Sequence, residues 1–431
     1  MPKKKKREKP HREYTKRQLS HWQQQQRRQR IITATGIFLI TTVIVILIAG
    51  WYTNIFRPLN RTAIIVNETE FNMKYFIGML NVKGINQGNT AVQDQSSDYL
   101  QYLANNVKND IEQNELVKQG ALKLGVSVSD DEIKQELKKS GLPAEDFYKD
   151  IVRSQLLFEK LRTGYFEREV PQTAKQVQIM VILLENEANA NEIKARLVNG
   201  ESFTELAGDL SLDQSSKEKN GDLGWHTKKI LGDLQGTLIP AEFAFSAETG
   251  ALSQPLYDED IYKRVGYWLI KVLERKEADD TLNAQAMLLS SEEEARDVRA
   301  RLEAGEDFAT LARELSNLPK VEENGGNYED LGRDTLTPAF AEFAFDTDIE
   351  PETLSEPIRD ETVPTKGGYW LVKVVDKSDN RQIEESDRDL MKGQALNEWI
   401  NSLWDDPNNL VNDSFLDDEI ITWAAQQAMK N

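Results

Sequence analysis

Side chains that could perform nucleophilic, acid–base or metal chemistry are scarce in this sequence. Of its 431 residues none is cysteine and only three are histidine, His11, His21 and His226. The lack of cysteine excludes thiolate nucleophiles, disulfide bonds and cysteine-ligated metals. His11 and His21 lie in a basic N-terminal segment, so His226, beside the sequence NGDLG, is the one histidine in the rest of the chain. We interpret it as a surface turn residue rather than a catalytic one.

Carboxylates are abundant, with 72 Asp and Glu against 53 Lys and Arg. No segment has the alternating acidic ligands and central glycine of a calcium-binding loop. HExxH, GxSxG, a phosphate-binding glycine loop and a dinucleotide-binding fingerprint are absent as well. We therefore expect no metal and no cofactor, and we interpret the acidic residues as a solvated surface.

Two tryptophans, Trp268 and Trp370, occupy the same place in a sequence that occurs twice. Each is the third residue of a GYW segment, GYWLIKV in the first copy and GYWLVKV in the second. Two further segments recur in the same order before it, ARLVNGESFTELAGDLS (195–211) with ARLEAGEDFATLARELS (300–316), and LIPAEFAF (238–245) with LTPAFAEFAF (336–345). Two copies of roughly 100 residues predict two similar domains in tandem rather than a solenoid of short repeats.

Each copy contains the same order of predicted elements. A β-branched run (177–184 or 284–289) opens it, and helices, a glycine-rich turn and a short helix ending in EFAF follow. Each copy then closes on a strand pair that ends in its own GYW segment, which gives the order β-α-α-α-β-β. We expect an α+β fold in which residues 173–277 and 280–377 each form a four-stranded antiparallel sheet with surrounding helices.

The N-terminal part of the chain has the pattern of a membrane anchor. Residues 1–30 hold 12 Lys and Arg against two Glu, and no charge follows between Arg30 and Arg57. The apolar run begins at Ile31, and about 20 residues at ~1.5 Å each cross the ~30 Å hydrocarbon core of a bilayer. This run is too long for a usual signal peptide and lacks a small-x-small cleavage site. We expect a transmembrane helix over 31–53, a cytoplasmic basic tail and an extracytoplasmic remainder. We expect the basic tail to have no nucleic-acid partner.

Helical patterns flank the repeats on both sides. In residues 62–172, Ser127 or Ser129 can cap a helix that opens with three acidic residues. In residues 380–431 an apolar stripe follows helical spacing and needs a surface to pack against. The stripe consists of Leu396, Trp399, Ile400 and Leu403. We expect these C-terminal helices to complete a domain with residues 62–172.

Both repeats resemble the parvulin-type (PpiC, rotamase) peptidyl-prolyl isomerase domain. The resemblance is carried by the ARL…G..F..LA…S helices, the NGDLGW turn, the EFAF helix and the closing GYW strand. Residues 62–172 resemble the N-terminal helical domain of SurA- and PrsA-like extracytoplasmic chaperones, notably in GALKLGVSVSDDEI (120–133). The resemblance implies a folding factor whose partners are unfolded or nascent secreted proteins.

The sequence departs from the parvulin family at the positions of its site residues. The two family histidines are replaced by Val181 and Trp268 in repeat 1, and by Ala286 and Trp370 in repeat 2. We therefore assign no residue as catalytic. The candidate substrate-binding residues that the resemblance implies are Asp213, Leu223, Leu238 and Trp268 in repeat 1, and Leu331, Leu336, Phe340 and Trp370 in repeat 2. Asp213 can equally be a solvated loop carboxylate, and the two tryptophans can equally pack in the core.

Loss of the histidines weakens catalysis but does not exclude it. Prolyl isomerisation has to overcome a rotation barrier of ~18–20 kcal/mol. An enzyme can lower this barrier by binding the twisted amide in a dry apolar pocket, with little proton transfer. We favour a membrane-anchored folding factor with weak or lost isomerase activity. The alternatives are an active isomerase that uses repeat 2, and a non-enzymatic adaptor of the secretion machinery.

Overall fold

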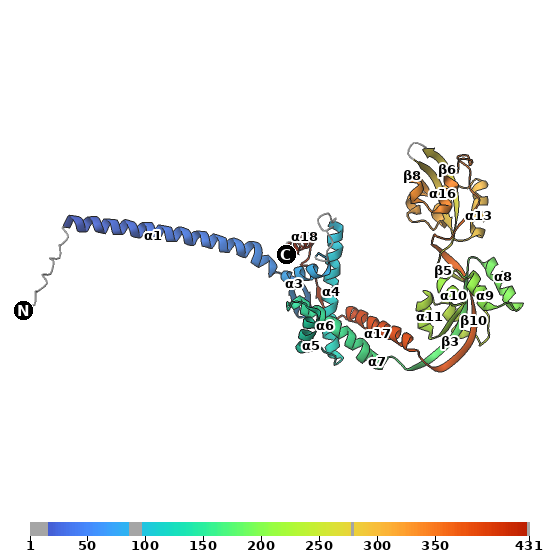
Figure 1. Cartoon of the computed structure of the whole chain (residues 1–431), viewed down its shortest axis with the longest axis horizontal. Helices are drawn as coiled ribbons and strands as arrows, with labels where there is room; N and C mark the ends of the chain where they lie inside the picture. The colour runs from blue at the N-terminus through green and yellow to red at the C-terminus, as the bar shows by residue number, and fades with distance from the viewer. Residues whose placement is uncertain (1–15, 86–96, 277–279, 429–431) are drawn as a thin grey trace, which may run out of the picture. The chain divides into compact units, whose positions relative to one another are not determined.

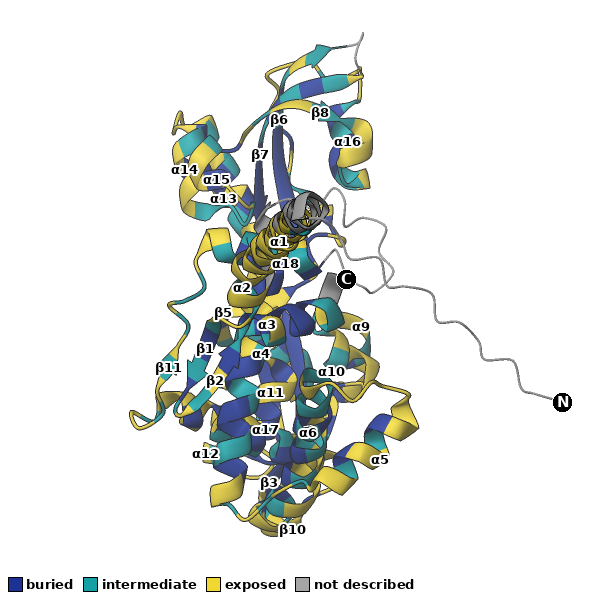
Figure 2. Ribbon diagram, turned by 90° about the vertical axis from the view of Figure 1, so that its left-hand side faces the viewer, coloured by how far each residue is buried: buried dark blue, intermediate teal, exposed yellow. Residues whose placement is uncertain are grey.

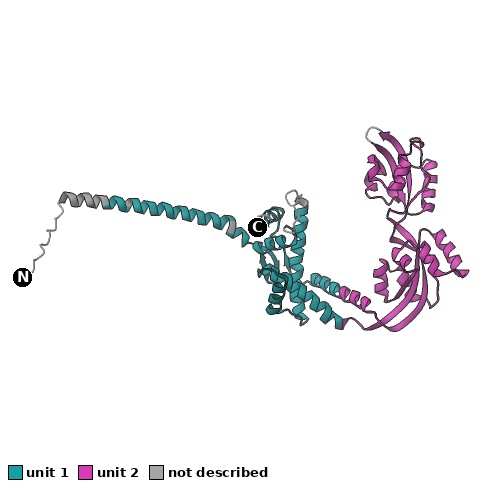
Figure 3. Ribbon diagram, viewed as in Figure 1, with its two compact units in different colours: residues 1–167, 395–431 teal, residues 168–394 magenta. Residues whose placement is uncertain are grey.

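The chain folds into two compact units, which Figure 3 shows in different colours. The first comprises residues 1–167 and 395–431, and the second comprises residues 168–394. The computed structural model describes residues 16–85, 97–276 and 280–428. Our prediction for the first part of the basic tail, residues 1–15, concerns residues outside the described part of the chain.

A long apolar helix opens the first unit. Helix α1 (Lys16–Trp51) continues without a break into η1 (Tyr52–Phe56) and α2 (Arg57–Leu59). Its apolar side chains face outward, for example Leu47 at 66% exposure, and Figure 2 colours the helix as exposed. Among the described residues, Gln26–Leu59 is the one helix that is long and apolar enough to cross a membrane. A large exposed apolar surface of this kind marks a site of contact with a membrane or with another protein.

The rest of the first unit is mostly helical (Figure 1), and it contains one small sheet. The sheet has the antiparallel order β11-β1-β2. The elements are β1 (Thr62–Val66), β2 (Thr69–Asn72), α3 (Met73–Leu80), η2 (Asn81–Ile85), α4 (Ser97–Lys123), α5 (Asp130–Ser140), α6 (Asp146–Lys160), η4 (Leu161–Tyr165), α7 (Phe166–Glu169), α17 (Glu385–Asp405), β11 (Val411–Asn412) and α18 (Asp418–Ala428). Helices α7 and α17 each cross the boundary between the two units.

The C-terminal helices share a core with the helices before the repeats. Leu396, Ile400 and Leu403 of α17 are buried together with Val107 and Ile111 of α4. Their helical spacing predicted such a partner surface. Gly120 of α4 allows the close approach, because a Cβ there would lie 2.9 Å from the side chains of both Trp399 and Leu403.

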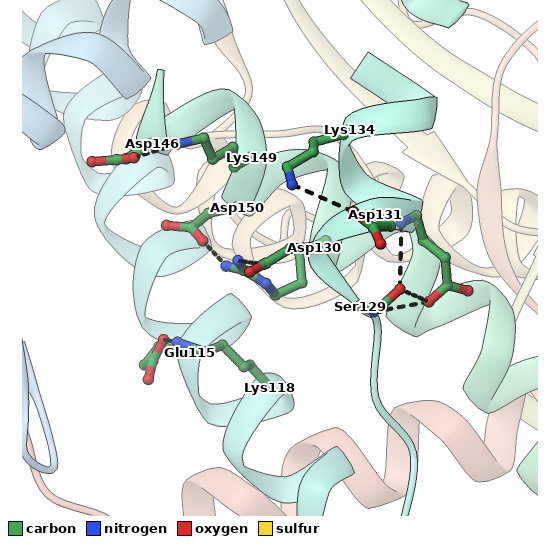
Figure 4. A network of polar contacts seen from close by, with 11 residues as sticks. Glu115, Lys118, Ser129, Asp130, Asp131, Lys134, Asp146, Lys149 and Asp150 are labelled. Carbon is green, nitrogen blue, oxygen red and sulfur yellow. Dashed lines mark hydrogen bonds and ion pairs between the residues drawn. The ribbon is translucent and has the colours of Figure 1, made fainter. Parts of the chain in front are cut away.

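The cap of α5 is Ser129 rather than Ser127. The Ser129 hydroxyl accepts a hydrogen bond from the backbone N–H of Glu132 at 3.3 Å, and Glu132 Oε2 accepts one from the backbone N–H of Ser129 at 2.8 Å. Hydrogen bonds from Lys160 and from Ser129 lower the pKa of the Glu132 carboxyl to about 2. Figure 4 shows Ser129 at the helix start, near the exposed ion pairs of Lys134 and Lys149. This reciprocal arrangement satisfies two N–H groups that the helix itself leaves unpaired.

Substitution Ser129→Ala should therefore destabilise α5 by about 1 kcal/mol. Hydrogen-exchange mass spectrometry of peptides from residues 130–140 measures this effect as faster amide exchange. Ser127→Ala is the matched control, since the Ser127 side chain caps nothing. Equal acceleration in the two variants would contradict the assignment of the cap.

The second unit contains two four-stranded antiparallel sheets with helices around each. The elements from repeat 1 are β3 (Thr173–Leu184), α8 (Glu187–Val198), α9 (Phe203–Leu210), α10 (Gln214–Glu218), β4 (Asp222–His226), α11 (Lys228–Gln235), α12 (Ile239–Ser246), β5 (Leu256–Lys263) and β6 (Gly266–Lys276). Those from repeat 2 are β7 (Thr281–Leu289), α13 (Glu292–Glu303), α14 (Phe308–Leu315), α15 (Val321–Asn324), β8 (Asn327–Gly332), η5 (Arg333–Thr335), α16 (Pro338–Ala344), β9 (Ile358–Asp360) and β10 (Thr365–Gln382). The expected fold class, α+β with two antiparallel sheets, is confirmed at this level.

The two repeats exchange their closing strands. The first sheet has the order β4-β3-β10-β5 and the second has the order β8-β7-β6-β9. Strand β6 of repeat 1 thus lies in the second sheet, where Trp268 pairs with Leu288. Strand β10 of repeat 2 lies in the first sheet, where Trp370 pairs with Leu183. Our expectation that each repeat closes on its own strand pair was wrong. The physical reason is that the two GYW strands carry nearly the same side chains, so either strand fits either sheet.

The crossing segments pack tightly against each other. Thr365 pairs with Lys263, and Gly266 pairs with Asp360. The two segments that connect one sheet to the other therefore run side by side. The Lys263 ammonium is buried and donates hydrogen bonds to the carbonyl oxygens of Lys366, at 3.3 Å, and Gly367. Burial of this ammonium lowers its pKa to about 8. The sequence repeats 173–277 and 280–377 therefore do not coincide with the two sheets.

Candidate functional site

An apolar cavity of about 210 Å³ lies against the second sheet. Its walls come from strands β6, β7 and β8, from the turn η5 and from α16 and the loop after α14. No lining residue carries a charge. The lining residues are Trp268, Ala286, Leu318, Pro319, Tyr328, Leu331, Thr335, Leu336, Thr337 and Phe340. Three of the sequence-predicted candidates from repeat 2, Leu331, Leu336 and Phe340, thus meet in one place, together with Trp268 from repeat 1.

Trp268 and Phe340 form the buried floor of the cavity. Their rings meet edge to face, with centroids 5.0 Å apart and an interplanar angle of 83°. The indole Nε1–H of Trp268 donates a hydrogen bond to Asp360 Oδ2 at 2.9 Å. Asp360 is 3% exposed and also accepts from the N–H of Thr362 at 2.9 Å. Burial raises the pKa of Asp360, but hydrogen bonds from Thr337, Thr362 and Trp268 outweigh it, so the pKa is lowered. An ionised carboxylate therefore fixes the tryptophan ring.

Four residues replace the family histidines, and the strand exchange changes which of them lie close together. In the sequence, Ala286 is followed by Trp370 within repeat 2, and we assigned them to one site. In the structure Ala286 shares the cavity with Trp268. Trp370 lies instead in the core of the first sheet, together with Val181. The cavity is thus built from both repeats, and repeat 2 alone would lack the Trp268 half of its floor.

The corresponding place in the first sheet is filled by protein side chains. Trp370 is 0% exposed, and its Nε1–H donates to Asp258 Oδ2 at 3.0 Å. Leu231 of α11 is 1% exposed and belongs to the same core as Trp370, Leu223 and Val181. Repeat 2 has only the three-residue turn η5 where repeat 1 has α11. The extra helix explains why the first sheet packs its tryptophan where the second sheet holds a cavity.

Two other candidates from repeat 1 lie away from the second-sheet cavity. Leu238 is 49% exposed and packs against Gly232. Asp213 is half-buried and caps α10, since its Oδ2 accepts hydrogen bonds from the N–H of Ser216 at 2.7 Å and from the hydroxyl of Ser215 at 2.9 Å. Its carboxylate is thus used locally, as a cap rather than as a solvated loop residue.

His226 is a half-buried strand residue, which corrects our interpretation of it as a surface turn. Its Nε2 lies 2.7 Å from the carbonyl oxygen of Leu223, and its Nδ1 lies 2.7 Å from Asp387 Oδ2. A carbonyl oxygen only accepts hydrogen bonds, so Nε2 carries a proton. His226 thus joins β4 to α17 and lies outside the cavity.

Sequence reasoning missed the two carboxylates that hold the tryptophans. Asp258 and Asp360 occupy the same place in the two repeats, in PLYDED and PIRDET. Each is the third residue of a strand that pairs with a GYW strand. Its carboxylate can therefore reach the indole on that neighbouring strand. The recurrence of an aspartate with each tryptophan was the signal available in the sequence.

The arrangement suits binding of a small apolar ring rather than acid–base chemistry. Thr335 Oγ1 donates to the carbonyl oxygen of Gly332 at 2.7 Å, and Thr337 is engaged with Asp360. The remaining lining hydroxyl is that of Tyr328, which is half-buried. The cavity therefore offers an apolar floor and at most one phenolic donor to a ligand.

Two stretches of the chain match a family of known proteins. Residues 166–276 and 277–376 each match the family described as PPIC-type PPIASE domain. The foldase protein PrsA of Caldanaerobacter subterraneus is 28% identical over 192 residues, which are 41% of this chain and 59% of that protein. Foldase protein PrsA 3 of Bacillus anthracis is 31% identical over 151 residues, 34% of this chain and 49% of that protein.

The chain thus matches about half to three fifths of the length of these relatives. A crystal structure of PrsA from Bacillus anthracis, 16% identical, aligns over 83% of this chain and 96% of that one with a TM-score of 0.24. The chain thus contains two stretches that each match the PPIC-type PPIASE domain, and it is similar to PrsA foldase proteins over part of its length.

Proposed function

We propose that this protein is a membrane-anchored folding factor that binds proline-containing segments of unfolded or nascent secreted polypeptides, with weak or lost isomerase activity. The observation that carries the proposal is the uncharged cavity over Trp268 and Phe340. Its volume of about 210 Å³ accommodates a pyrrolidine ring with part of the adjoining backbone. Burial of an apolar ring against two aromatic side chains supplies affinity without a demand for a particular neighbouring sequence.

Weak catalysis follows from the hydrogen bonds inside the cavity. A hundredfold acceleration requires the twisted amide to bind about 2.7 kcal/mol more tightly than the planar one. One neutral hydrogen bond contributes only about 1 kcal/mol. Both threonine hydroxyls are already engaged, and the family histidines are absent. We therefore expect this cavity to bind proline-containing segments without greatly accelerating rotation about the prolyl peptide bond.

The anchor belongs to the same proposal. The exposed apolar helix Gln26–Leu59 would span the membrane, with Arg27, Arg28 and Arg30 on the cytoplasmic side. Both folded units would then lie outside the cytoplasm. The similarity to proteins named foldase protein PrsA supports a role in folding. The acidic body would keep complexes with unfolded chains soluble.

An active isomerase is the second candidate, and Tyr328 is the observation that favours it. Its half-buried hydroxyl lines the cavity, where it could donate to the carbonyl oxygen or nitrogen of a twisted amide. A fixed-partner adaptor of the secretion machinery remains the third candidate. It differs from the first in requiring one stoichiometric partner instead of many unrelated unfolded clients.

Titration of the full chain in detergent with an unstructured proline-containing peptide tests the proposal. Phe340→Leu should weaken peptide binding roughly tenfold, because it removes an aromatic wall while keeping most of the buried volume. Leu238→Ala is the matched control and should leave binding unchanged, since Leu238 is exposed outside the cavity. Equal affinity of Phe340→Leu and the unaltered chain would contradict the assignment of the cavity.

The same samples separate the candidates. Exchange NMR of the peptide measures cis–trans rotation, and we expect less than a tenfold acceleration. A larger acceleration that Tyr328→Phe abolishes would establish the isomerase in place of the binding factor. Suppression of aggregation of several unrelated unfolded proteins supports the folding factor, whereas recovery of a single stoichiometric partner supports the adaptor.

A further inference from the structure

A second cavity lies where the apolar helix joins the folded part of the first unit. Its volume is about 820 Å³. One wall comes from η1, α2 and the residues just after them, and the other comes from the C-terminal helix α18. The lining residues that matter here are Tyr52, Phe56, Arg57, Arg61, Glu419 and Trp423. Segments from the two ends of the sequence thus form one site beside the apolar helix.

The position of this cavity along the helix places it at the level of lipid headgroups. Helix α1, η1 and α2 are continuous, and the apolar run ends at Gly50. Seven further residues at ~1.5 Å each place Arg57 about 10 Å beyond the end of the apolar run. The headgroup region of a bilayer begins directly at the end of its ~30 Å hydrocarbon core. This step rests on the membrane anchor of the proposed function.

The aromatic side chains of the cavity fit the same location. Tyr52 and Phe56 are 50% and 43% exposed, and their rings stack with centroids 5.6 Å apart. Trp423 reaches the site from α18. Tyrosine and tryptophan are enriched where a membrane meets water, because their rings are apolar and their tips are polar. The fold therefore adds an aromatic ring from the C-terminal helix to those of the anchor.

The cavity is lined by charged groups of both signs. Arg61 is held in place because its Nη2–H donates to the carbonyl oxygen of Phe415 at 3.0 Å. Arg57 is exposed, and its side chain has no ion pair among the described residues. Two guanidinium groups suit a phosphodiester. The Glu419 carboxylate and the aromatic faces suit an ammonium group.

We propose that this cavity binds the headgroup of one phospholipid that carries a primary ammonium, of the phosphatidylethanolamine type. Its phosphodiester lies against Arg57 and Arg61, and its ammonium lies against Glu419 and the rings of Phe56 and Trp423. Its acyl chains run alongside α1, in the direction of the apolar segment. The bound lipid would then hold the folded unit at a fixed height above the membrane.

Native mass spectrometry of the full chain released from nanodiscs tests this site. The nanodiscs contain phosphatidylcholine doped with either phosphatidylethanolamine or phosphatidylglycerol. We expect one retained phosphatidylethanolamine per chain. Arg57→Gln should lower its retention roughly tenfold, because it removes a charge-assisted contact to the phosphate. Arg27→Gln, at the opposite end of the same helix, is the matched control and should change nothing. Glu419→Gln should abolish the preference for phosphatidylethanolamine over phosphatidylglycerol.

Three results would overturn the site. They are an equal loss of lipid in Arg57→Gln and Arg27→Gln, retention of phosphatidylglycerol in preference to phosphatidylethanolamine, and incorporation into nanodiscs without any retained lipid. Arg57 is exposed, so its substitution leaves the folded unit intact. A chain that fails to enter nanodiscs at all would instead contradict the membrane anchor. The lipid measurement does not depend on peptide binding, so it is independent of the cavity over Trp268.

Discussion

Cysteines placed at positions 274 and 283 are expected to form a disulfide bond, whereas cysteines at 283 and 376 are not. Glu274 of β6 pairs directly with Asn283 of β7, and the Asn283 Nδ2–H donates to Glu274 Oε2 at 3.3 Å. Directly opposed residues of antiparallel strands have the Cα separation that a disulfide requires. Asp376 holds the place of Glu274 in the second GYW strand, so it would pair with Asn283 if repeat 2 closed on itself.

The first sheet supplies the mirror experiment. Asp376 pairs with Gln178 of β3, so cysteines at 178 and 376 should link, and cysteines at 178 and 274 should not. The native chain contains no cysteine, so each double variant has a single possible intramolecular disulfide. Mass spectrometry of non-reduced digests identifies the linked peptides. Formation of the 283–376 and 178–274 disulfides instead would show that each repeat closes on its own strand.

The exchange also changes how the chain must fold. Strand β3 pairs with β10 across a long stretch of chain, because all of repeat 2 up to β9 lies between them in the sequence. Pairings between residues so far apart carry a large loop-closure cost and form slowly. Strand β6, in contrast, pairs with β7 across a short connection. The second sheet is therefore the one with local contacts and the natural first folding unit.

Sequence reasoning predicted the elements of each repeat but could not predict their pairing. Helix caps, β-branched runs and glycine-rich turns are local signals, and they placed strands and helices near their observed bounds. Pairing depends on which distant strand offers a matching face. GYWLIKV and GYWLVKV differ only at Ile270 and Val372, so composition and periodicity are the same for both arrangements. The choice depends on the connections, whose conformation the periodicity does not encode.

The candidate site shows the same division between local and distant information. The apolar residues Leu331, Leu336 and Phe340 lie close together in sequence, and they line one cavity as expected. The floor residue Trp268 comes from the other repeat, through the strand exchange. Asp360 looks like one more surface carboxylate in an acidic chain, yet it is buried against the indole. When a site includes residues from two strands, a wrong prediction of which strands pair therefore also gives a wrong set of site residues.

Substitution Glu112→Gln is expected to stabilise the first unit at alkaline pH. Glu112 of α4 is 3% exposed, and its Oε1 has no hydrogen-bond partner among the described residues. Burial raises the pKa of its carboxyl to about 7, while Lys108 lowers the pKa and Asp413 raises it. Lys108 is itself paired with Asp413 at 2.7 Å, so it compensates the buried charge only in part. A buried carboxylate without full compensation destabilises the folded state.

The sign of the pH dependence follows from the direction of this shift. The folded state holds the Glu112 proton more tightly than the unfolded state, whose carboxyl has a pKa near 4.5. The stabilising contribution is therefore fully present below about pH 4.5 and is lost as the pH rises through about 7. Between these values the free energy of unfolding should fall by on the order of 2–3 kcal/mol on account of this group. Glutamine has no proton to lose, so the Glu112→Gln variant should be the more stable protein at pH 8.

Urea unfolding at pH 5 and pH 8, followed by the signal of the helical unit, measures the effect. Glu115→Gln is the matched control on the same helix, because Glu115 is 5% exposed but accepts hydrogen bonds from Thr69, Lys118 and Gln119, each at 2.8 Å. This control should destabilise the unit at pH 8, since it removes a charge that is fully bonded. The two substitutions make the same chemical change one turn apart and should act in opposite directions. If both destabilise the unit equally at pH 8, Glu112 is compensated in the folded state, and the pH dependence of the unit must come from other carboxyls.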